Sequence, residues 1–79
     1  MNPEERAVAD AALQQYGARL TDSDFIARGE KVLSVKLEIK KGRLRMLDPA
    51  GRSLATYPAS KIATGVSDFV EKFWFWKRS

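Results

Sequence analysis

Residues 33 to 57 alternate apolar and polar side chains with a period of two, and two short turn sequences interrupt the alternation. A period of two places successive side chains on opposite faces of a β-strand. The stretch therefore predicts three antiparallel strands joined in a meander, with one face buried and the other open to water. In the first predicted strand the apolar set is Leu33, Val35, Leu37 and Ile39, and the polar set is Ser34, Lys36, Glu38 and Lys40.

The two turn sequences set the register of this meander. Lys41-Gly42 suits a two-residue hairpin loop, because glycine accepts a positive φ without steric cost, and such a loop places Lys40 opposite Arg43. The Asp-Pro-Ala-Gly sequence of residues 48–51 has proline where a type I turn fixes φ and glycine where a left-handed residue follows. It therefore predicts a three-residue loop between the second and third strands.

Counting outward from the second turn assigns the faces of the third strand. Met46 then meets Leu54 on the buried face, and Arg43 meets Tyr57 on the open face. A slip of one residue would reverse these assignments, because side chains alternate between the faces. We therefore expect Leu54 to be buried and Tyr57 to be an aromatic ring within the open face.

Capping residues predict a helix before the sheet. Asn2, Pro3 and Glu5 combine a cap, a first-turn proline and a third-position glutamate, and they open a helix that runs to about Gln15. Its inner stripe should consist of Val8, Ala9, Ala12, Leu13 and Tyr16.

A second capping sequence, Thr21-Asp22-Ser23-Asp24, predicts a short helix that ends at Gly29. Phe25 and Ile26 would form its inner face.

Ser60 begins the last predicted helix, in which apolar residues recur on one narrow arc. These residues are Ile62, Val66, Phe69, Phe73 and Trp76. The predicted fold class is α+β: a three-stranded antiparallel meander with helices packed on one face, in the order α-(short α)-β-β-β-α, forming a single small domain of residues 1–79.

The absence of histidine and cysteine restricts the chemistry of this chain. Histidine bases, thiolate nucleophiles and the common zinc sites are excluded, and Asp22 and Asp24 are better explained as a helix start than as a catalytic pair. We therefore expect a protein that is not an enzyme and that has no cofactor and no metal. No apolar run approaches the roughly 20 residues of a membrane-spanning helix, and no secretory leader is recognisable, so we expect a cytoplasmic location.

Charge is unevenly distributed along the chain. Residues 1–30 contain three bases and six acids, a net charge of −3, whereas residues 31–79 contain eleven bases and four acids, a net charge of +7. The predicted register gathers bases and one aromatic ring on the open face of the sheet, a combination that can hold phosphates and stack a base. The candidate nucleic-acid-binding residues are Lys36, Lys40, Lys41, Arg43, Arg45 and Tyr57. The same bases also suit a solvated face that keeps the protein soluble.

Four consecutive aromatic residues near the C-terminus, Phe73-Trp74-Phe75-Trp76, exceed what one small core can enclose on one side of a helix. Some of them either complete the core as an extended segment or contact another molecule. Trp74, Phe75 and Trp76 are therefore candidates for an interface with a partner protein or in a homodimer. The alternative function is a small adaptor or inhibitor, of the kind that mobile elements encode, which docks through this terminus or through an open strand edge.

The order of one helix, three strands and a final helix in a short basic chain is similar to that of double-stranded-RNA-binding domains. The similarity covers nearly the whole chain and rests on element order, since Ser60-Lys61-Ile62-Ala63 stands where those domains have a lysine cluster. It implies an α+β fold and contact with RNA, and it does not assign the family.

Overall fold

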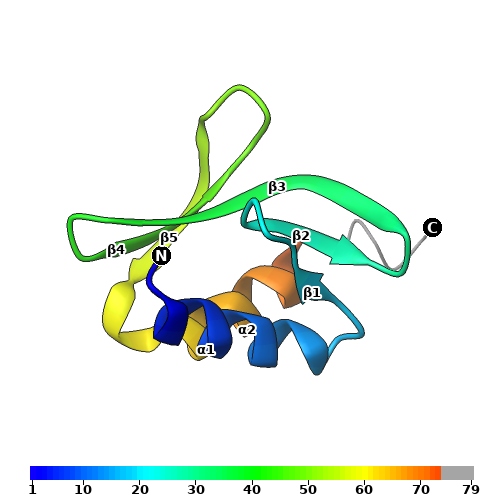
Figure 1. Ribbon diagram of the computed structural model, residues 1–79. Helices are drawn as coiled ribbons and strands as arrows, with labels where there is room; N and C mark the ends of the chain where they lie inside the picture. The colour runs from blue at the N-terminus through cyan, green and yellow to red at the C-terminus, as the bar shows by residue number, and fades with distance from the viewer. Residues whose placement is uncertain (74–79) are drawn as a thin grey trace.

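The computed structural model describes residues 1–73, which form a five-stranded antiparallel sheet with two helices against one of its faces (Figure 1). This confirms the predicted α+β class and the predicted position of the helices. The strands follow one another in the sheet in chain order, from β1 to β5. The elements are α1 (Pro3–Gln14), β1 (Arg19–Leu20), β2 (Phe25–Arg28), β3 (Lys31–Lys40), β4 (Arg43–Leu47), β5 (Ser53–Pro58), a 3-10 turn (Ala59–Lys61) and α2 (Ile62–Lys72).

The predicted capping box begins α1. The side chain of Asn2 accepts a hydrogen bond of 2.8 Å from the backbone of Glu5, and the carboxylate of Glu5 accepts one of 2.9 Å from the backbone of Asn2. Two amide groups that the helix cannot satisfy are thereby paired. Of the predicted inner stripe, Val8 is 44% exposed and does not belong to the core, because it lies at the edge of the arc of the buried residues Ala9, Ala12 and Leu13.

The β3–β4 hairpin has the predicted register. Lys40 pairs with Arg43, and Leu37 pairs with Met46. Both loop residues have positive φ, 52° at Lys41 and 73° at Gly42, as a type I′ turn requires. The alternation in the sequence and the turn chemistry were therefore sufficient to fix this part of the fold.

The β4–β5 hairpin begins as predicted and then departs from the predicted register. Its loop closes through hydrogen bonds between Asp48 and Arg52. A bulge follows in β5, so that Met46 pairs with Ala55 instead of Leu54. An extra residue in one strand reverses the faces of all residues beyond it. Leu54 is consequently 40% exposed, and the prediction that it is buried was wrong.

The predicted short helix between Thr21 and Gly29 is wrong, because this segment forms a loop and the strand β2. The side chain of Thr21 accepts a hydrogen bond from the backbone of Phe25, four residues on, whereas a helix cap accepts from the residue two or three positions on. Asp24 takes a left-handed φ of 68°, which prevents the chain from continuing as a helix. The sheet therefore has two strands, β1 and β2, that were not predicted from the sequence.

One hydrophobic core lies between the sheet and the two helices. Phe69 of α2 and Leu13 of α1 are fully buried in it, together with Leu37, Leu44 and Met46 from the sheet. Within the described residues no helix combines the length and the apolar character needed to cross a bilayer.

Candidate nucleic-acid interface

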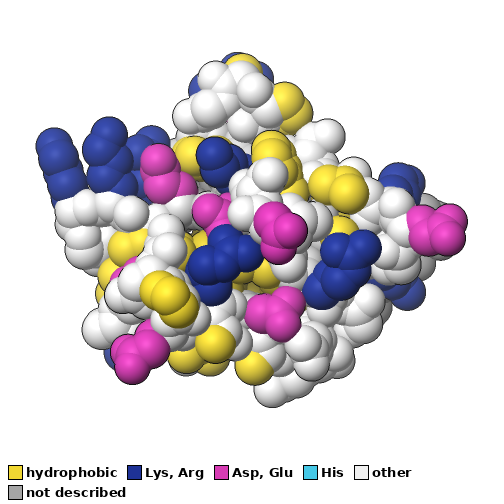
Figure 2. Space-filling model, viewed as in Figure 1, with side chains coloured by type: hydrophobic (Ala, Val, Ile, Leu, Met, Phe, Trp, Pro, Cys, Tyr) yellow, Lys and Arg dark blue, Asp and Glu magenta, His cyan; other side chains and the backbone are white. Residues whose placement is uncertain are grey.

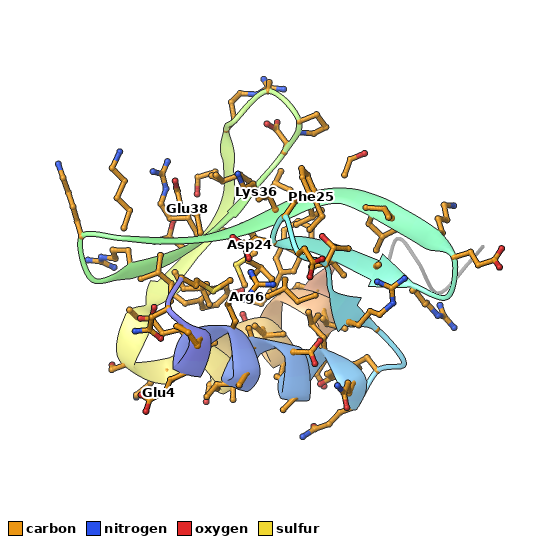
Figure 3. All side chains as sticks on the ribbon, viewed as in Figure 1. Glu4, Arg6, Asp24, Phe25, Lys36 and Glu38 are labelled. Carbon is orange, nitrogen blue, oxygen red and sulfur yellow. The ribbon has the colours of Figure 1, made fainter. Side chains whose placement is uncertain are left out.

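The five predicted basic residues share the open face of the sheet, four of them at the β3–β4 hairpin and Lys36 in the middle of β3. Lys36 and Lys40 alternate with the buried positions of β3, Arg43 and Arg45 do the same in β4, and Lys41 is in the turn between the strands. Figure 3 shows Lys36 and Glu38 on the side of the sheet away from the helices, and Figure 2 shows basic side chains gathered over the β3–β4 hairpin. We call Lys36, Lys40, Lys41, Arg43 and Arg45 the basic face.

Only one member of the basic face has an acidic partner within residues 1–73. Arg45 and Glu38 are cross-strand neighbours, and their charged atoms are 3.5 Å apart. The remaining four bases have no ion pair in the described part of the chain. They are Lys36, Lys40, Lys41 and Arg43, all of them exposed. Their charges are therefore uncompensated and free to attract an anion.

The tip of the β3–β4 hairpin keeps its bases at two positions where other residues would be more stable. Lys41 has a φ of 52°, a conformation that asparagine and glycine adopt at lower cost. Lys40 lies directly opposite Arg43, and like charges in that arrangement repel. Stability alone explains neither the lysine at position 41 nor the two opposed bases at positions 40 and 43.

The predicted aromatic member of this surface, Tyr57, is not on it. The bulge in β5 turns Tyr57 toward α2, where its hydroxyl donates a hydrogen bond of 2.8 Å to Asp68. Burial, followed by this hydrogen bond, raises the pKa of Tyr57 to about 12. The prediction that Tyr57 stacks a base on the open face was wrong, because the strand register beyond the bulge differs from the register predicted from the turn sequence.

A different aromatic residue, Phe25, lies on the open face in its place. Phe25 of β2 pairs with Lys36 of β3, and cross-strand partners point to the same side of a sheet. Figure 3 shows the two side chains close together on the side away from the helices. The sequence signal for this arrangement was Gly29-Glu30, a loop pair between two short apolar runs, which is typical of a hairpin.

Phe25 also borders a hollow of about 290 Å³ on this face. Pro49 from the β4–β5 loop closes the hollow on one side. The lining residues are Phe25, Val32, Leu33, Ser34 and Pro49. The hollow therefore joins an apolar surface to the basic face.

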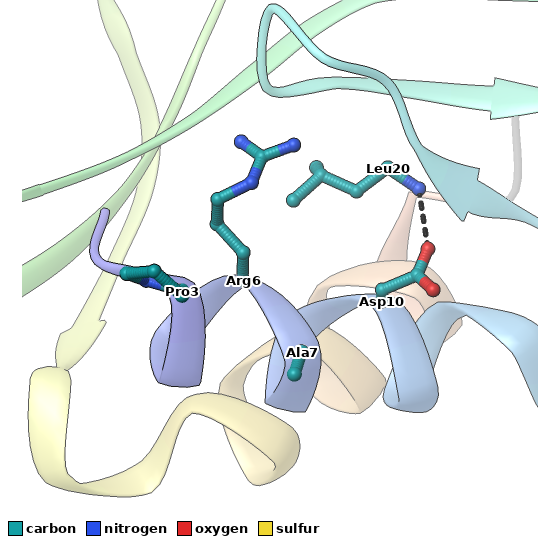
Figure 4. A pocket seen from close by; sticks show the side chains of 5 residues that line it. All are labelled: Pro3, Arg6, Ala7, Asp10 and Leu20. Atoms are coloured by element: carbon teal, nitrogen blue, oxygen red, sulfur yellow. Dashed lines mark hydrogen bonds between the residues drawn. The ribbon is translucent and has the colours of Figure 1, made fainter.

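A second pocket, of about 400 Å³, lies between α1 and β1 and has a structural explanation (Figure 4). One oxygen of Asp10 accepts a hydrogen bond of 2.8 Å from the backbone of Leu20. Arg6 forms an ion pair with Asp24 and donates a hydrogen bond of 2.9 Å to the carbonyl of Thr21. Both charged residues of this pocket thus hold the β1–β2 hairpin against α1.

The predicted protein interface consisted of the C-terminal aromatic residues or an open strand edge. Trp74, Phe75 and Trp76 lie outside the described residues, so their role stays a prediction. The first strand of the predicted meander, β3, is paired on both sides, and the edges of the sheet are β1 and β5. An interface through an open edge would therefore use one of these two strands.

No family model, curated protein or solved structure with which the chain was compared matches it significantly.

Proposed function

We propose that the protein binds nucleic acid through the basic face. The observation that carries the proposal is that, among residues 1–73, four exposed bases have no acidic partner and lie on a sheet face that neither helix covers. Phosphates supply regularly spaced negative charge, and each neutralised phosphate releases a counterion, which drives association.

The two costly positions at the hairpin tip support the same proposal. A base at Lys41 and two opposed bases at Lys40 and Arg43 each lower stability slightly relative to a neutral or glycine-rich turn. An anionic partner would offset the repulsion between Lys40 and Arg43, and it would pair with the charge at position 41. Residues held at some cost to folding are a reason to look for function.

Binding should depend on salt in proportion to the number of phosphates contacted. With four contacts, the logarithm of the association constant should fall against the logarithm of salt concentration with a slope of about −3. Fluorescence anisotropy of a labelled oligonucleotide between about 50 and 200 mM salt measures this slope.

The most discriminating test of the basic face is the double variant Lys40→Gln, Arg43→Gln. These residues face each other, so neutralising them removes repulsion and should leave the fold intact. We expect the slope to become less negative by about 1.5 and the affinity at low salt to fall. Lys31→Gln, at the opposite end of β3, is the matched control and should change neither quantity.

Two outcomes contradict the proposal. One is the absence of salt-dependent binding at about 50 mM salt. The other is equal displacement of the oligonucleotide by a polyglutamate peptide of the same charge, which would show a surface for acidic chains in general.

A further inference from the structure

The hollow beside Lys36 has features that phosphate binding alone does not require. Val32 in its wall is 55% exposed, more than any other large hydrophobic side chain of the described residues. The ring of Phe25 forms another part of the wall, and the hydroxyl of Ser34 can donate and accept hydrogen bonds there. Lys36, the cross-strand partner of Phe25, supplies a positive charge next to this apolar surface.

We propose that this hollow holds one base of a single-stranded nucleic acid, which stacks on Phe25 while the adjoining phosphates contact the basic face. The inference rests on the proposed function and names the form of nucleic acid. Aromatic side chains bind the exposed faces of unstacked bases with little sequence preference. In a duplex those faces are already stacked on their neighbours and are not available to a side chain.

The shape of the sheet also favours a single strand. The loop of the β4–β5 hairpin extends away from the sheet on its open side (Figure 1), and its Pro49 borders the hollow. A wide, stiff duplex would meet this loop before its bases reached Phe25, whereas a flexible strand can pass beside it.

The distances along β3 fit a short segment of such a strand. Lys36 and Lys40 are four residues apart, which is about 13 Å at 3.3 Å per residue. A few nucleotides of a flexible single strand span this length. The strand would run from the hollow along β3 to the hairpin tip, with bases toward Phe25 at one end and phosphates on the lysines.

The test compares probes and variants at one salt concentration. The probes are an oligothymidine of about ten nucleotides, a chain of the same length and charge with abasic residues throughout, and a duplex of the same length. Phe25→Leu keeps an apolar side chain in the half-buried site but removes the aromatic face. Phe25→Tyr keeps that face and is the conservative control.

We expect the protein to bind the oligothymidine at least about fivefold more tightly than the abasic chain or the duplex, a ratio within the range of one stacked base. Phe25→Leu should abolish this preference without changing the salt slope, and Phe25→Tyr should retain it. Thermal unfolding of each variant verifies that the fold is intact, and if Phe25→Leu unfolds, Val32→Thr tests the same wall of the hollow.

The failures of the two proposals are distinguishable. If the abasic chain and the duplex bind as tightly as the oligothymidine and only the Lys40→Gln, Arg43→Gln variant weakens binding, the stacking site is excluded and the basic face remains. If none of the probes binds, both proposals fail.

Discussion

The hydroxyl of Tyr57 donates a hydrogen bond of 2.8 Å to Asp68, and Lys72 forms an ion pair of 3.1 Å with the same carboxylate. The aromatic ring of Tyr57 lies against Gly65, which precedes Asp68 by about one turn of α2. A β-carbon added at position 65 would lie 2.8 Å from the ring carbon Cγ of Tyr57. This contact and the hydrogen bond fix the distance between β5 and α2.

Gly65→Ala should destabilise the protein. At an exposed helix position this change stabilises by about 1 kcal/mol, but here the new methyl group overlaps the Tyr57 ring, and we expect a loss of about 1–3 kcal/mol in the free energy of unfolding. Urea denaturation measures the loss. Thr64→Ala, the exposed neighbour in α2, is the control and should lie within about 0.5 kcal/mol of the wild type. A Gly65→Ala protein as stable as the wild type would contradict the contact.

Tyr57→Phe should remove a stabilising contribution that disappears in alkali. Burial and the bond to Asp68 raise the pKa of Tyr57 from 10.0 to about 12. A raised pKa in the folded state favours the neutral phenol, so the contribution is complete below pH 10 and is lost as the pH rises through about 12. The stability difference between the wild type and Tyr57→Phe should therefore shrink over this range. Tyrosinate absorbance should show the late-titrating phenol in the wild type and not in the variant.

The same hydrogen-bonded pair, Tyr57 and Asp68, also makes the stability of the protein depend on pH in acid, where stability falls as the pH falls. The hydrogen bond from Tyr57, and then the interactions with Lys72, lower the pKa of Asp68 below 3.8. The ionised carboxylate therefore adds stability above pH 3.8, and this contribution is lost as the pH falls below that value. Asp68→Asn should reduce that acid dependence and serves as the control for Tyr57→Phe.

Lys41→Asn should increase stability and weaken binding at the same time. Asparagine accepts the φ of 52° more readily than lysine, so we expect a gain of about 0.5–1 kcal/mol in the free energy of unfolding. Removing one base should make the salt slope less negative by about 0.7. Lys41→Gln removes the charge but keeps the strained backbone, so it should weaken binding equally without the gain from relieved backbone strain. Unchanged oligonucleotide affinity in both variants would exclude Lys41 from the interface.

Asp24→Asn should loosen the β1–β2 hairpin from α1. Asparagine tolerates the left-handed φ of 68° at this position, but it cannot form the ion pair with the half-buried Arg6. We expect a loss of about 1 kcal/mol, which becomes smaller at high salt. Asp22→Asn, exposed in the same loop, is the matched control. Equal urea midpoints for the two variants would show that the ion pair contributes nothing.

The sequence alone determined α1, the apolar arc of α2 from Ile62 to Phe69, and the β3–β4 hairpin. In each case the information is local: a capping box at Asn2, a helical arc of apolar residues, or a two-residue turn at Lys41-Gly42 between alternating strands. Because side chains alternate strictly in a strand, that hairpin also fixed the positions of the five bases on one face.

Only the tertiary structure decided which aromatic residue joins those bases. One extra residue in β5 moved Tyr57 to the helix side, and nothing in the local turn sequence signals that bulge. The residues that follow Thr21 suit the start of a helix and the start of a turn equally well, so they do not distinguish the two. The pairing of this segment with β3, which places Phe25 beside Lys36, is a contact between distant parts of the chain. Strand register and strand pairing depend on the partners that a segment finds in the folded chain, and local sequence does not encode those partners.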